Sequence, residues 1–460
     1  MSNQADLVIK NSRLLLESGL TRGGLAVKKG KISAIATDEH LPDGKEVIDA
    51  EGNIVMPGLI DAHAHIHDPD MLSHEDFTTG SRAAAAGGVT TVIDMPLVSQ
   101  VDTPDALQKK VEAGESMSII DFSFTAGMMY SENVKIVKMM LEEGVAAFKA
   151  FTGEPFPADA GVMIRLLSEA SEYGAQITVH AEDPGILREF SNDMEGEWDA
   201  PISHSLSRPV IAEHLAISQL VDIAKRTGGH LHIAHVTSDA GIREIERGRK
   251  ESVMVTTEVC PHHLMFHRDQ MNRLGVKSKM NPPLRTKRDK SALWSALLRG
   301  TIDITVSDHA PCPIEKKEAG THDIREAWAG VDGTQMILRV LLSEGINSGR
   351  LPYSTLLHVA SRNPARIFGL YPKKGVLRIG SDADLVIINP TKKEKINPEM
   401  MFSKCGWTLY DGLEMTGAPE MTFVRGEMVF KENRTTIRPG HGEFQQMGLS
   451  NKHLGGANVV

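Results

Sequence analysis

The stretch Ile54-Val55-Met56-Pro57-Gly58-Leu59-Ile60-Asp61-Ala62-His63-Ala64-His65 decides how the rest of the chain is interpreted. Its apolar beginning has the length and composition of a buried strand. Side chains of a strand alternate between two faces, so residues two apart point the same way. His63 and His65 are therefore expected to project together from the C-terminal end of the strand, where two imidazoles could bind one metal ion. Because a lone His-x-His is more often an ordinary pair of core or surface histidines, this prediction depends on what the other strands contribute.

The composition is that of an ordinary soluble globular protein, with 41% hydrophobic and 24% charged residues among 460. A chain of this length can bury one large core and a smaller one. The net charge of −10 is spread along the chain and no apolar run is long enough to span a membrane, so we expect neither a nucleic-acid nor a membrane partner. The three cysteines are odd in number and far apart, and residues 1–10 do not resemble a secretory signal, which favours a cytoplasmic protein.

Short alternating segments, typical of strands in a half-buried sheet, occur at both ends of the chain. They cover residues 7–9, 24–27, 31–35, 383–388 and 421–430. The sequence from Lys28 to Lys31 is typical of a hairpin turn. Neither end is large enough to fold alone, so we predict one small β-sandwich domain built from residues 1–55 and 372–445. Residues 446–460 are assigned to a C-terminal tail.

Between these ends, strand-like runs alternate with helix-length amphipathic segments, which predicts parallel βα units. Eight runs can be counted: residues 55–65, 90–96, 118–128, 146–152, 176–182, 230–238, 253–260 and 303–312. Eight units between residues 56 and 371 predict an α/β fold with a (β/α)8 TIM-like barrel, whose active site lies at the C-terminal ends of the strands. A doubly wound sheet would need a Gly-rich loop after an early strand, whereas Gly87-Gly88 precedes one.

Titratable residues lie at or near the C-terminal ends of five of these eight runs. They are His63 and His65 in the first run, Lys149 in the fourth, His180 in the fifth, His235 in the sixth and Asp308 in the eighth. A paired core residue would explain one such side chain, but hardly a set that shares one face of a barrel. Four imidazoles and a carboxylate predict a site for one or two divalent cations.

Lys149 does not fit such a site as a plain ammonium, because a cation cannot ligate a metal and is repelled by one. One interpretation is a structural salt bridge to an acidic neighbour. The other is a carbamate formed from Nζ and CO2, an anion whose two oxygens could bridge metal ions about 3.5–4 Å apart.

The His-x-His after Pro57-Gly58-Leu59-Ile60-Asp61, the strand-ending Lys149 and the sequence Asp308-His309-Ala310-Pro311, together with His180 and His235, resemble the amidohydrolase superfamily. They resemble most closely its cyclic amidases: the dihydroorotases, allantoinases and hydantoinases (dihydropyrimidinases). The likeness runs from about Leu7 to Phe444, and residues 375–386 also look like the C-terminal β segment of that superfamily.

The resemblance implies two divalent metal ions, with zinc expected and manganese, cobalt, nickel or iron as alternatives. In that family His63 and His65 would bind the more buried ion, His180 and His235 the more exposed one, a carbamylated Lys149 would bridge them, and Asp308 would complete the first site. A hydroxide between the metals would attack the ring carbonyl, and Asp308 would pass its proton to the departing amide nitrogen. Asp308 as a metal ligand alone is the alternative role.

The sequence near these ligands bears on the substrate. Dihydroorotases share a His-x-His-x-Arg whose arginine meets the substrate carboxylate, and here that position is His67, a poor replacement beside two cations. Residues 94–99 and 306–312 look like allantoinase, whereas residues 279–285 look like dihydroorotase. The tyrosine that hydantoinases suggest shortly after the bridging lysine is absent from residues 151–156. We therefore predict hydrolysis of allantoin to allantoate, with dihydroorotase or hydantoinase as the alternative.

Three residues are candidates for contact with the substrate. Asn281 could hydrogen-bond the ring imide or cap a turn before Pro282. Gly333 could let the backbone approach the ring or satisfy a turn, and His67 could line the pocket or lie in a solvated loop.

Other polar residues are expected to act indirectly or not at all. A supporting or salt-bridge role is predicted for Glu182. His262, His263 and His309 are expected to be supporting or structural, and one of them could fix a ligand or donate to the leaving group. The remaining histidines, among them His74, His204, His214, His230 and His232, are expected to be ordinary structural residues.

A relative that had lost its chemistry and served as an assembly protein, as happens among hydantoinase-like proteins, is the competing class. Such a chain would lack ligands, and all six are present. The expected partners are a small cyclic ureide or amide as substrate and, as the resemblance implies, further copies of the chain in a homodimer or homotetramer.

Overall fold

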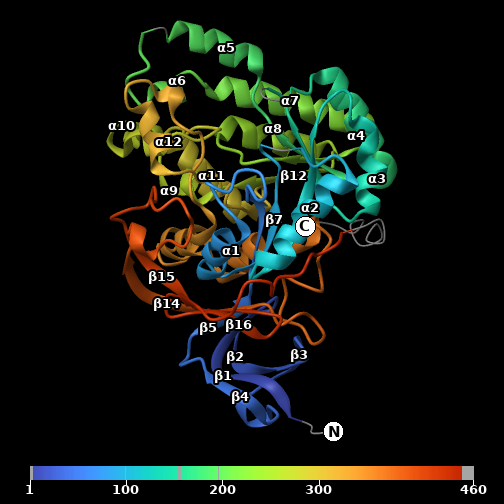
Figure 1. Ribbon diagram of the computed structural model, residues 1–460, viewed down its shortest axis with the longest axis vertical. Coiled ribbons are helices and arrows are strands. Elements are labelled where there is room, and N and C mark those ends of the chain that lie inside the picture. Colours follow the sequence, from blue (N-terminus) through green and yellow to red (C-terminus); the bar gives the residue numbers. More distant parts are fainter. Residues whose placement is uncertain (1–3, 99, 154–156, 195, 448–460) are drawn as a thin grey trace.

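The structure is a computed structural model that describes residues 4–98, 100–153, 157–194 and 196–447. A barrel wrapped in helices forms most of the molecule, and a β-sheet that contains the N-terminal strands lies at one end (Figure 1). Within the described residues, no helix is long and apolar enough to cross a membrane.

Eight parallel strands form the barrel, and they are neighbours in the order in which they occur along the chain. They are β6 (Leu59–Ala64), β7 (Val89–Asp94), β8 (Asp121–Met129), β9 (Ala147–Phe151), β10 (Gln176–His180), β11 (His230–Ile233), β12 (Val255–Val259) and β13 (Ile304–Thr305). The first and last strands meet through a parallel bridge between Ala64 and His309, so the sheet almost closes on itself. The predicted (β/α)8 barrel is confirmed.

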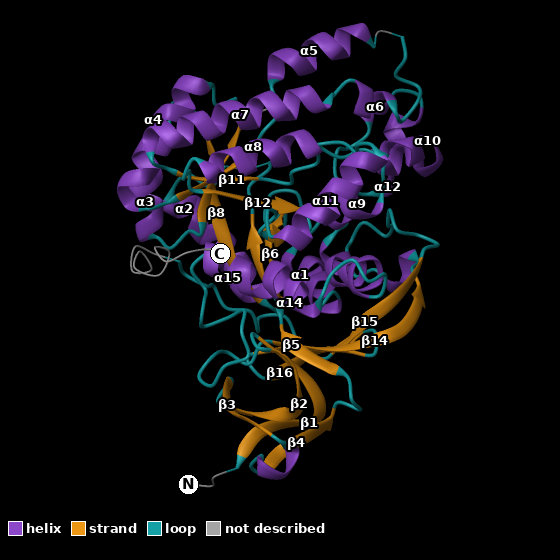
Figure 2. Ribbon diagram, turned by 180° about the vertical axis from the view of Figure 1, so that it is seen from behind, coloured by secondary structure: helices purple, strands orange, loops and turns teal. Residues whose placement is uncertain are grey.

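The helices cover the outside of these strands (Figure 2). They are α1 (Phe77–Ala86), α2 (Pro104–Met117), α3 (Val137–Glu142), α4 (Ala160–Tyr173), α5 (Pro184–Asp193), α6 (Ser203–Leu206), α7 (Val210–Thr227), α8 (Asp239–Lys250), α9 (Pro261–Met265), α10 (Met271–Leu274), α11 (Lys287–Arg299), α12 (Ile314–Glu318), α13 (Ile337–Val340), α14 (Tyr353–Leu357) and α15 (Asn363–Ile367). Several begin at an Asp, Ser or Thr whose side chain accepts the backbone N–H three residues on, which satisfies a free donor of the first turn.

We expected the run from Ile54 to His65 to form one strand, but it forms two. β5 (Ile54–Pro57) pairs with strands of the terminal sheet, and β6 pairs with β7 of the barrel. The break falls at Gly58, whose N–H donates to Asp384 O at 2.9 Å. A Cβ at this position would collide with the side chain of Thr90, so only glycine fits where the chain passes from one sheet to the other.

The two chain ends form one small β domain, as predicted, and its strands are hydrogen-bonded as a single nine-stranded sheet. The strands are β1 (Ala5–Leu16), β2 (Gly19–Lys28), β3 (Lys31–Ala36), β4 (Gly44–Asp49), β5, β14 (Leu385–Lys395), β15 (Glu414–Val424), β16 (Glu427–Lys431) and β17 (Arg434–Thr435). The predicted hairpin is confirmed, since Lys28 pairs with Lys31. Leu14 and Leu25 from the first half pack in one core with Leu385 and Phe423 from the second.

A buried charge cluster joins the β domain to the barrel. Lys374 Nζ lies 2.6 Å from Asp121 Oδ2 at the start of β8 and 2.5 Å from Asp384 Oδ2, just before β14. Asp382 Oδ2 lies 3.4 Å from the same nitrogen, and Arg425 also pairs with Asp121. With Lys31, which lies 2.8 Å from Asp382, three cations balance the three buried carboxylates where the two sheets meet.

The chain returns to the barrel after the last strand of the β domain. Phe444 forms a bridge with Phe122 of β8, and its ring centroid lies 5.7 Å from that of Phe124. Met447, which we had assigned to the tail, is 5% exposed and packs in the barrel core. The rest of that predicted tail, residues 448–460, lies outside the described residues.

Candidate metal centre

His63 and His65 point together from the end of β6, with ring centroids 5.1 Å apart. His63 Nδ1 lies 2.5 Å from Glu258 Oε1, and His65 Nδ1 lies 2.8 Å from Met95 O. If each Nδ1 carries the hydrogen, the lone pair of each ring is on Nε2. Both rings are then oriented as metal ligands.

The two Nε2 atoms face the carboxylate of Asp308, which follows β13. Asp308 Oδ1 lies 3.4 Å from His63 Nε2 and 3.1 Å from His65 Nε2. Burial alone would raise the pKa of Asp308, but His63, His65 and His235 together hold it well below its usual value. One ligand atom from each of His63, His65 and Asp308 lies within 4.8 Å of the others, so these three could hold a cation.

His180 and His235 face each other at the ends of β10 and β11. His180 Nδ1 lies 3.1 Å from His235 Nε2, and His180 Nε2 lies 2.9 Å from Glu182 Oε2. The ring of His235 also lies 5.4 Å from that of His63, centroid to centroid, so the two pairs of imidazoles adjoin. Two adjoining pairs of imidazoles could serve two neighbouring ions.

Lys149, on β9, is 1% exposed. Burial lowers its pKa to about 8, although Glu258 and Asp308 act in the opposite direction. Within the described part of the chain, the ion pairs of those two carboxylates are all with histidines, and the Lys149 ammonium lies 5.0 Å from the ring centroid of Phe151. The salt-bridge interpretation of Lys149 therefore has no support in the geometry.

Two of these residues have left-handed backbone conformations, which are unfavourable for residues other than glycine. The φ angle is 31° at His235 and 47° at Asp308. Such strain costs on the order of 1–3 kcal/mol and concentrates at functional sites, where surrounding contacts enforce it. Here the backbone of His235 is held by Glu258 Oε1 at 3.1 Å, and that of Asp308 by His63 O at 2.9 Å.

Glu258 is a supporting residue that the sequence analysis missed. Its carboxylate is fully buried on β12 and binds the rings of His63 and His232 as well as the backbone of His235. The available signal was a single glutamate inside an otherwise strand-like run, and His232, which we expected to be an ordinary structural residue, is its partner.

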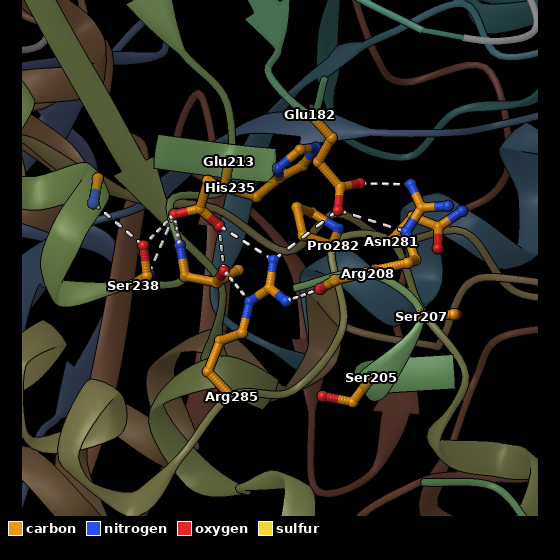
Figure 3. Close-up of polar contacts among 12 residues, drawn as sticks. Glu182, Ser205, Ser207, Arg208, Glu213, His235, Ser238, Asn281, Pro282 and Arg285 are labelled. Atoms are coloured by element: carbon orange, nitrogen blue, oxygen red, sulfur yellow. Dashed lines mark hydrogen bonds and ion pairs between the residues drawn. The ribbon is translucent and has the colours of Figure 1, made fainter. Parts of the chain in front are cut away.

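Glu182 holds His180. Glu182 is itself held by Arg208 and Arg285 (Figure 3). Arg208 contacts both carboxylate oxygens of Glu182, and Arg285 Nη2 lies 3.8 Å from Oε1. Arg285 also lies 3.5 Å from Glu213. Arg208, Glu182, Arg285 and Glu213 thus form a chain in which positive and negative side chains alternate. The predicted salt bridge of Glu182 is present, and it fixes the ring of a candidate ligand.

Two of the residues predicted to contact the substrate, Asn281 and Gly333, have defined neighbours in the structure. Asn281 Oδ1 lies 3.0 Å from His204 Nε2, which makes His204 a support that the sequence analysis passed over. Gly333 lies beside Ser307: a Cβ would come within 2.5 Å of Ser307 O. Close approach to the strand that carries Asp308, and not a left-handed turn, therefore explains this glycine.

His67 is 5% exposed, so the solvated-loop alternative is wrong. Its ring centroid lies 6.4 Å from that of His65 and 6.0 Å from that of Trp328, while His74 lies 4.5 Å from Trp328. Burial, together with the charges of His65, His74 and Lys110, lowers the pKa of His67 to about 2. His67 is therefore neutral and belongs to an aromatic wall beside the predicted ligands.

The donor set fits divalent metal ions. His63 Nε2 and His235 Nδ1 are buried and have no hydrogen-bond partner among the described residues, although a buried polar atom normally has one. Neutral imidazoles with a carboxylate suit zinc and the neighbouring transition metals.

A barrel of parallel strands that brings four imidazoles and a carboxylate to the C-terminal ends of its strands is typical of metal-dependent hydrolases. The chain belongs to the amidohydrolase family, whose sequence profile matches residues 54–429. This is the superfamily that the motifs resembled.

Relatives with different named activities are equally similar to this chain. The L-hydantoinase of Paenarthrobacter aurescens is 34% identical over 448 residues, which cover 95% of this chain and 97% of that protein. A dihydroorotase of Methanosarcina mazei is 34% identical (95% and 97% covered), and an allantoinase of Escherichia coli K12 is 34% identical (92% and 95% covered). The solved structure of L-Hydantoinase (Dihydropyrimidinase) from Arthrobacter aurescens superposes with a TM-score of 0.93 at 32% identity, over 96% of this chain and all of that one. The cyclic amidases are thus its relatives, and overall identity does not select a substrate.

Proposed function

We propose that this protein hydrolyses a ring C–N bond of a neutral cyclic ureide, with allantoin as the substrate and allantoate as the product. The observation that carries this choice is His67. At the position where dihydroorotases resemble one another in an arginine, this chain has a buried imidazole that stays uncharged. A neutral ring suits an uncharged substituent better than a carboxylate, which would lose its hydration without gaining a cationic partner.

The chain's own residues account for positioning and proton transfer. Divalent metal ions held by His63, His65, His180, His235 and Asp308 would polarise the ring carbonyl and acidify a water molecule. Asp308 takes one proton from that water, whose oxygen bonds to the carbonyl carbon. The C–N bond then breaks, and Asp308 returns the proton to the departing nitrogen. The open-chain ureido acid leaves.

The same proposal includes a carbamate on Lys149. Lys149 first loses its ammonium proton; the neutral amine then attacks CO2, a C–N bond forms and the nitrogen loses a second proton, so that a buried cation becomes an anion among the candidate ligands. Its support is the burial of Lys149 among candidate ligands without a carboxylate partner.

Asn281 and Gly333 would contact the ring. With Asn281 Oδ1 held by His204, its Nδ2 is the group that would donate to a ring carbonyl. The backbone near Gly333 would meet the ring from a position set by its close packing against Ser307.

A second candidate substrate is a hydantoin with an aromatic side group. His67, His74 and Trp328 form a wall of neutral rings, and such a wall would bind an apolar substituent.

A hydrolysis panel tests the proposal. Allantoin, dihydroorotate, hydantoin, a 5-benzyl hydantoin and dihydrouracil are offered to the same sample, whose metal content is measured. We expect allantoin to give the highest kcat/KM. A preference for the benzyl compound would select the second candidate, and turnover of dihydroorotate alone would refute both.

A substitution sharpens the test. His67→Arg should raise kcat/KM for dihydroorotate relative to allantoin, because it supplies a cation for the carboxylate. His67→Asn is the matched control, since it changes the ring without adding charge. If both variants shift the ratio equally, charge at this position does not set the preference.

A further inference from the structure

A second group of metal-binding residue types lies at the C-terminal end of β12, and it includes none of the six ligands proposed above. Cys260 follows the strand, and His262 and His263 lie in the short helix α9 that begins there. Cys260 and His262 are fully buried, and His263 is 3% exposed. One ligand atom from each, the Cys260 sulfur and one ring nitrogen from each histidine, lies within 4.8 Å of the other two.

The nitrogens of these histidines lack partners. Both ring nitrogens of His262 and Nδ1 of His263 are buried, and none has a hydrogen-bond partner among the described residues. Leaving a buried polar atom unsatisfied is unfavourable, and here three such atoms occur in adjacent side chains. His263 Nε2 lies 3.0 Å from Pro282 O, so its hydrogen belongs on Nε2 and its lone pair on Nδ1, as in a metal-binding histidine.

We propose that Cys260, His262 and His263 bind a further divalent ion of the zinc class. A thiolate and two imidazoles are typical ligands of zinc, and a fourth position would remain for water. Ligand atoms around a tetrahedral zinc ion lie about 3.5 Å apart, given Zn–N and Zn–S bonds of about 2.0–2.3 Å. A rotation of the side chains that closes the 4.8 Å span by about 1 Å would complete the geometry.

The surrounding charge favours a cation over a bare thiolate. The charges of Asp308, Glu258 and Asp61 act on Cys260 and favour a metal ion there, while Lys149 near Cys260 and Lys317 near His262 act in the opposite direction. Binding would release the thiol proton to solvent, so the metal–sulfur bond replaces the S–H bond.

Such an ion would position a substrate-binding segment. His263 already holds the carbonyl of Pro282, next to Asn281, and the ion would fix that histidine to the end of β12. Its role would be to hold the segment in place and not to take part in the reaction.

Cobalt spectroscopy of the full-length protein tests this site independently of the hydrolytic centre. The six proposed ligands of that centre include no cysteine, so a thiolate-to-cobalt charge-transfer band in the near ultraviolet can only report a cysteine site. The protein is stripped of metal, loaded with Co²⁺ and titrated. We expect one Co²⁺ per chain to produce this band. The Co²⁺ ions at the hydrolytic centre should produce visible ligand-field bands only.

Substitutions assign the band. Cys260→Ser and His262→Gln should abolish it and lower the bound cobalt by one ion per chain. Cys405→Ser is the matched control, since Cys405 is also a buried free thiol, and it should leave the band unchanged. A cobalt-loaded wild-type protein with visible bands but no charge-transfer band would overturn the proposal, even if a variant failed to fold. Survival of the band in Cys260→Ser would overturn it as well.

Discussion

At the scale of single residues, we expect replacement of Lys149 to reduce activity and metal binding most. Lys149 is buried near Glu258 and Asp308, and both carboxylates pair with histidines. Lys149→Ala should lower kcat by more than about a hundredfold and reduce bound metal, because the proposed bridging ligand is lost. Short-chain carboxylic acids should restore part of the activity by occupying the space and supplying a carboxylate.

Lys149→Met is the matched control for that rescue, because its side chain fills the same volume and leaves no room for an added acid. Full activity in either variant would exclude a bridging role. Equal rescue of both would show that the acid acts elsewhere.

Glu258 should set how tightly the histidines hold metal. Glu258→Gln keeps the shape of the side chain but removes the charge that orients His63 and the backbone of His235. We expect metal affinity to fall about 10–100-fold, as is usual for groups that support a ligand. Competition with a chelator measures it, and Glu246→Gln, whose partners Arg299 and Thr301 lie away from the barrel mouth, should leave the affinity unchanged.

The candidate ligands are visible in the sequence, whereas the support that Glu258 gives them is not. A ligand at the end of a strand is visible locally, because an apolar run and a polar terminus are adjacent in the chain. The contact between Glu258 and His63 joins residues 195 apart and exists only because the barrel nearly closes. His67 illustrates the same limit, since its burial depends on Trp328 and His74.

At the scale of the elements, Gly58 separates two strands that the sequence presents as one run. Gly58→Ala should lower the midpoint of thermal unfolding, because the added methyl group meets the side chain of Thr90 where β5 turns into β6. Overpacking of this kind costs typically 1–3 kcal/mol. Differential scanning calorimetry measures the loss.

The double variant Gly58→Ala with Thr90→Ala is the control for that collision. Removing the Thr90 hydroxyl and methyl should recover part of the lost stability. If the double variant is no more stable than the sum of the single variants predicts, the loss comes from the backbone of Gly58 and not from contact with Thr90.

Strand existence was predictable and strand boundaries were not. All eight barrel runs contain a strand, because apolar segments between helical ones leave little choice of architecture. The run at 303–312, however, holds only the two-residue β13, since the chain there turns to present Asp308. The run at 55–65 divides for a reason that lies in another element, the side chain of Thr90.

At the scale of the whole molecule, the buried cluster around Lys374 should matter most for stability. Lys374→Met leaves Asp121, Asp382 and Asp384 without their shared cation. Breaking a buried ion pair by removing one partner costs about 3–5 kcal/mol. We therefore expect a clear drop in the unfolding midpoint in urea.

Lys373→Met is a neighbouring control. Its ammonium is about half exposed and lies 4.0 Å from Asp382, so it should change stability by at most about 1 kcal/mol. Equal effects of the two substitutions would show that the cluster does not hold the β domain to the barrel.

The meeting of the first and last barrel strands has a mechanical consequence. His63 and His65 stand on one side of that junction and Asp308 on the other, while the backbone across it is joined by few hydrogen bonds, among them His65 N to His309 O and Asp308 N to His63 O. An ion bound by all three side chains would cross-link the two sides of this junction and stabilise the closure of the barrel. Treatment with a chelator should therefore speed deuterium uptake in residues 59–65 and 304–309 while leaving β9 and β10 protected. Without a bound ion, the barrel would therefore open between its first and last strands before the strands themselves unfold.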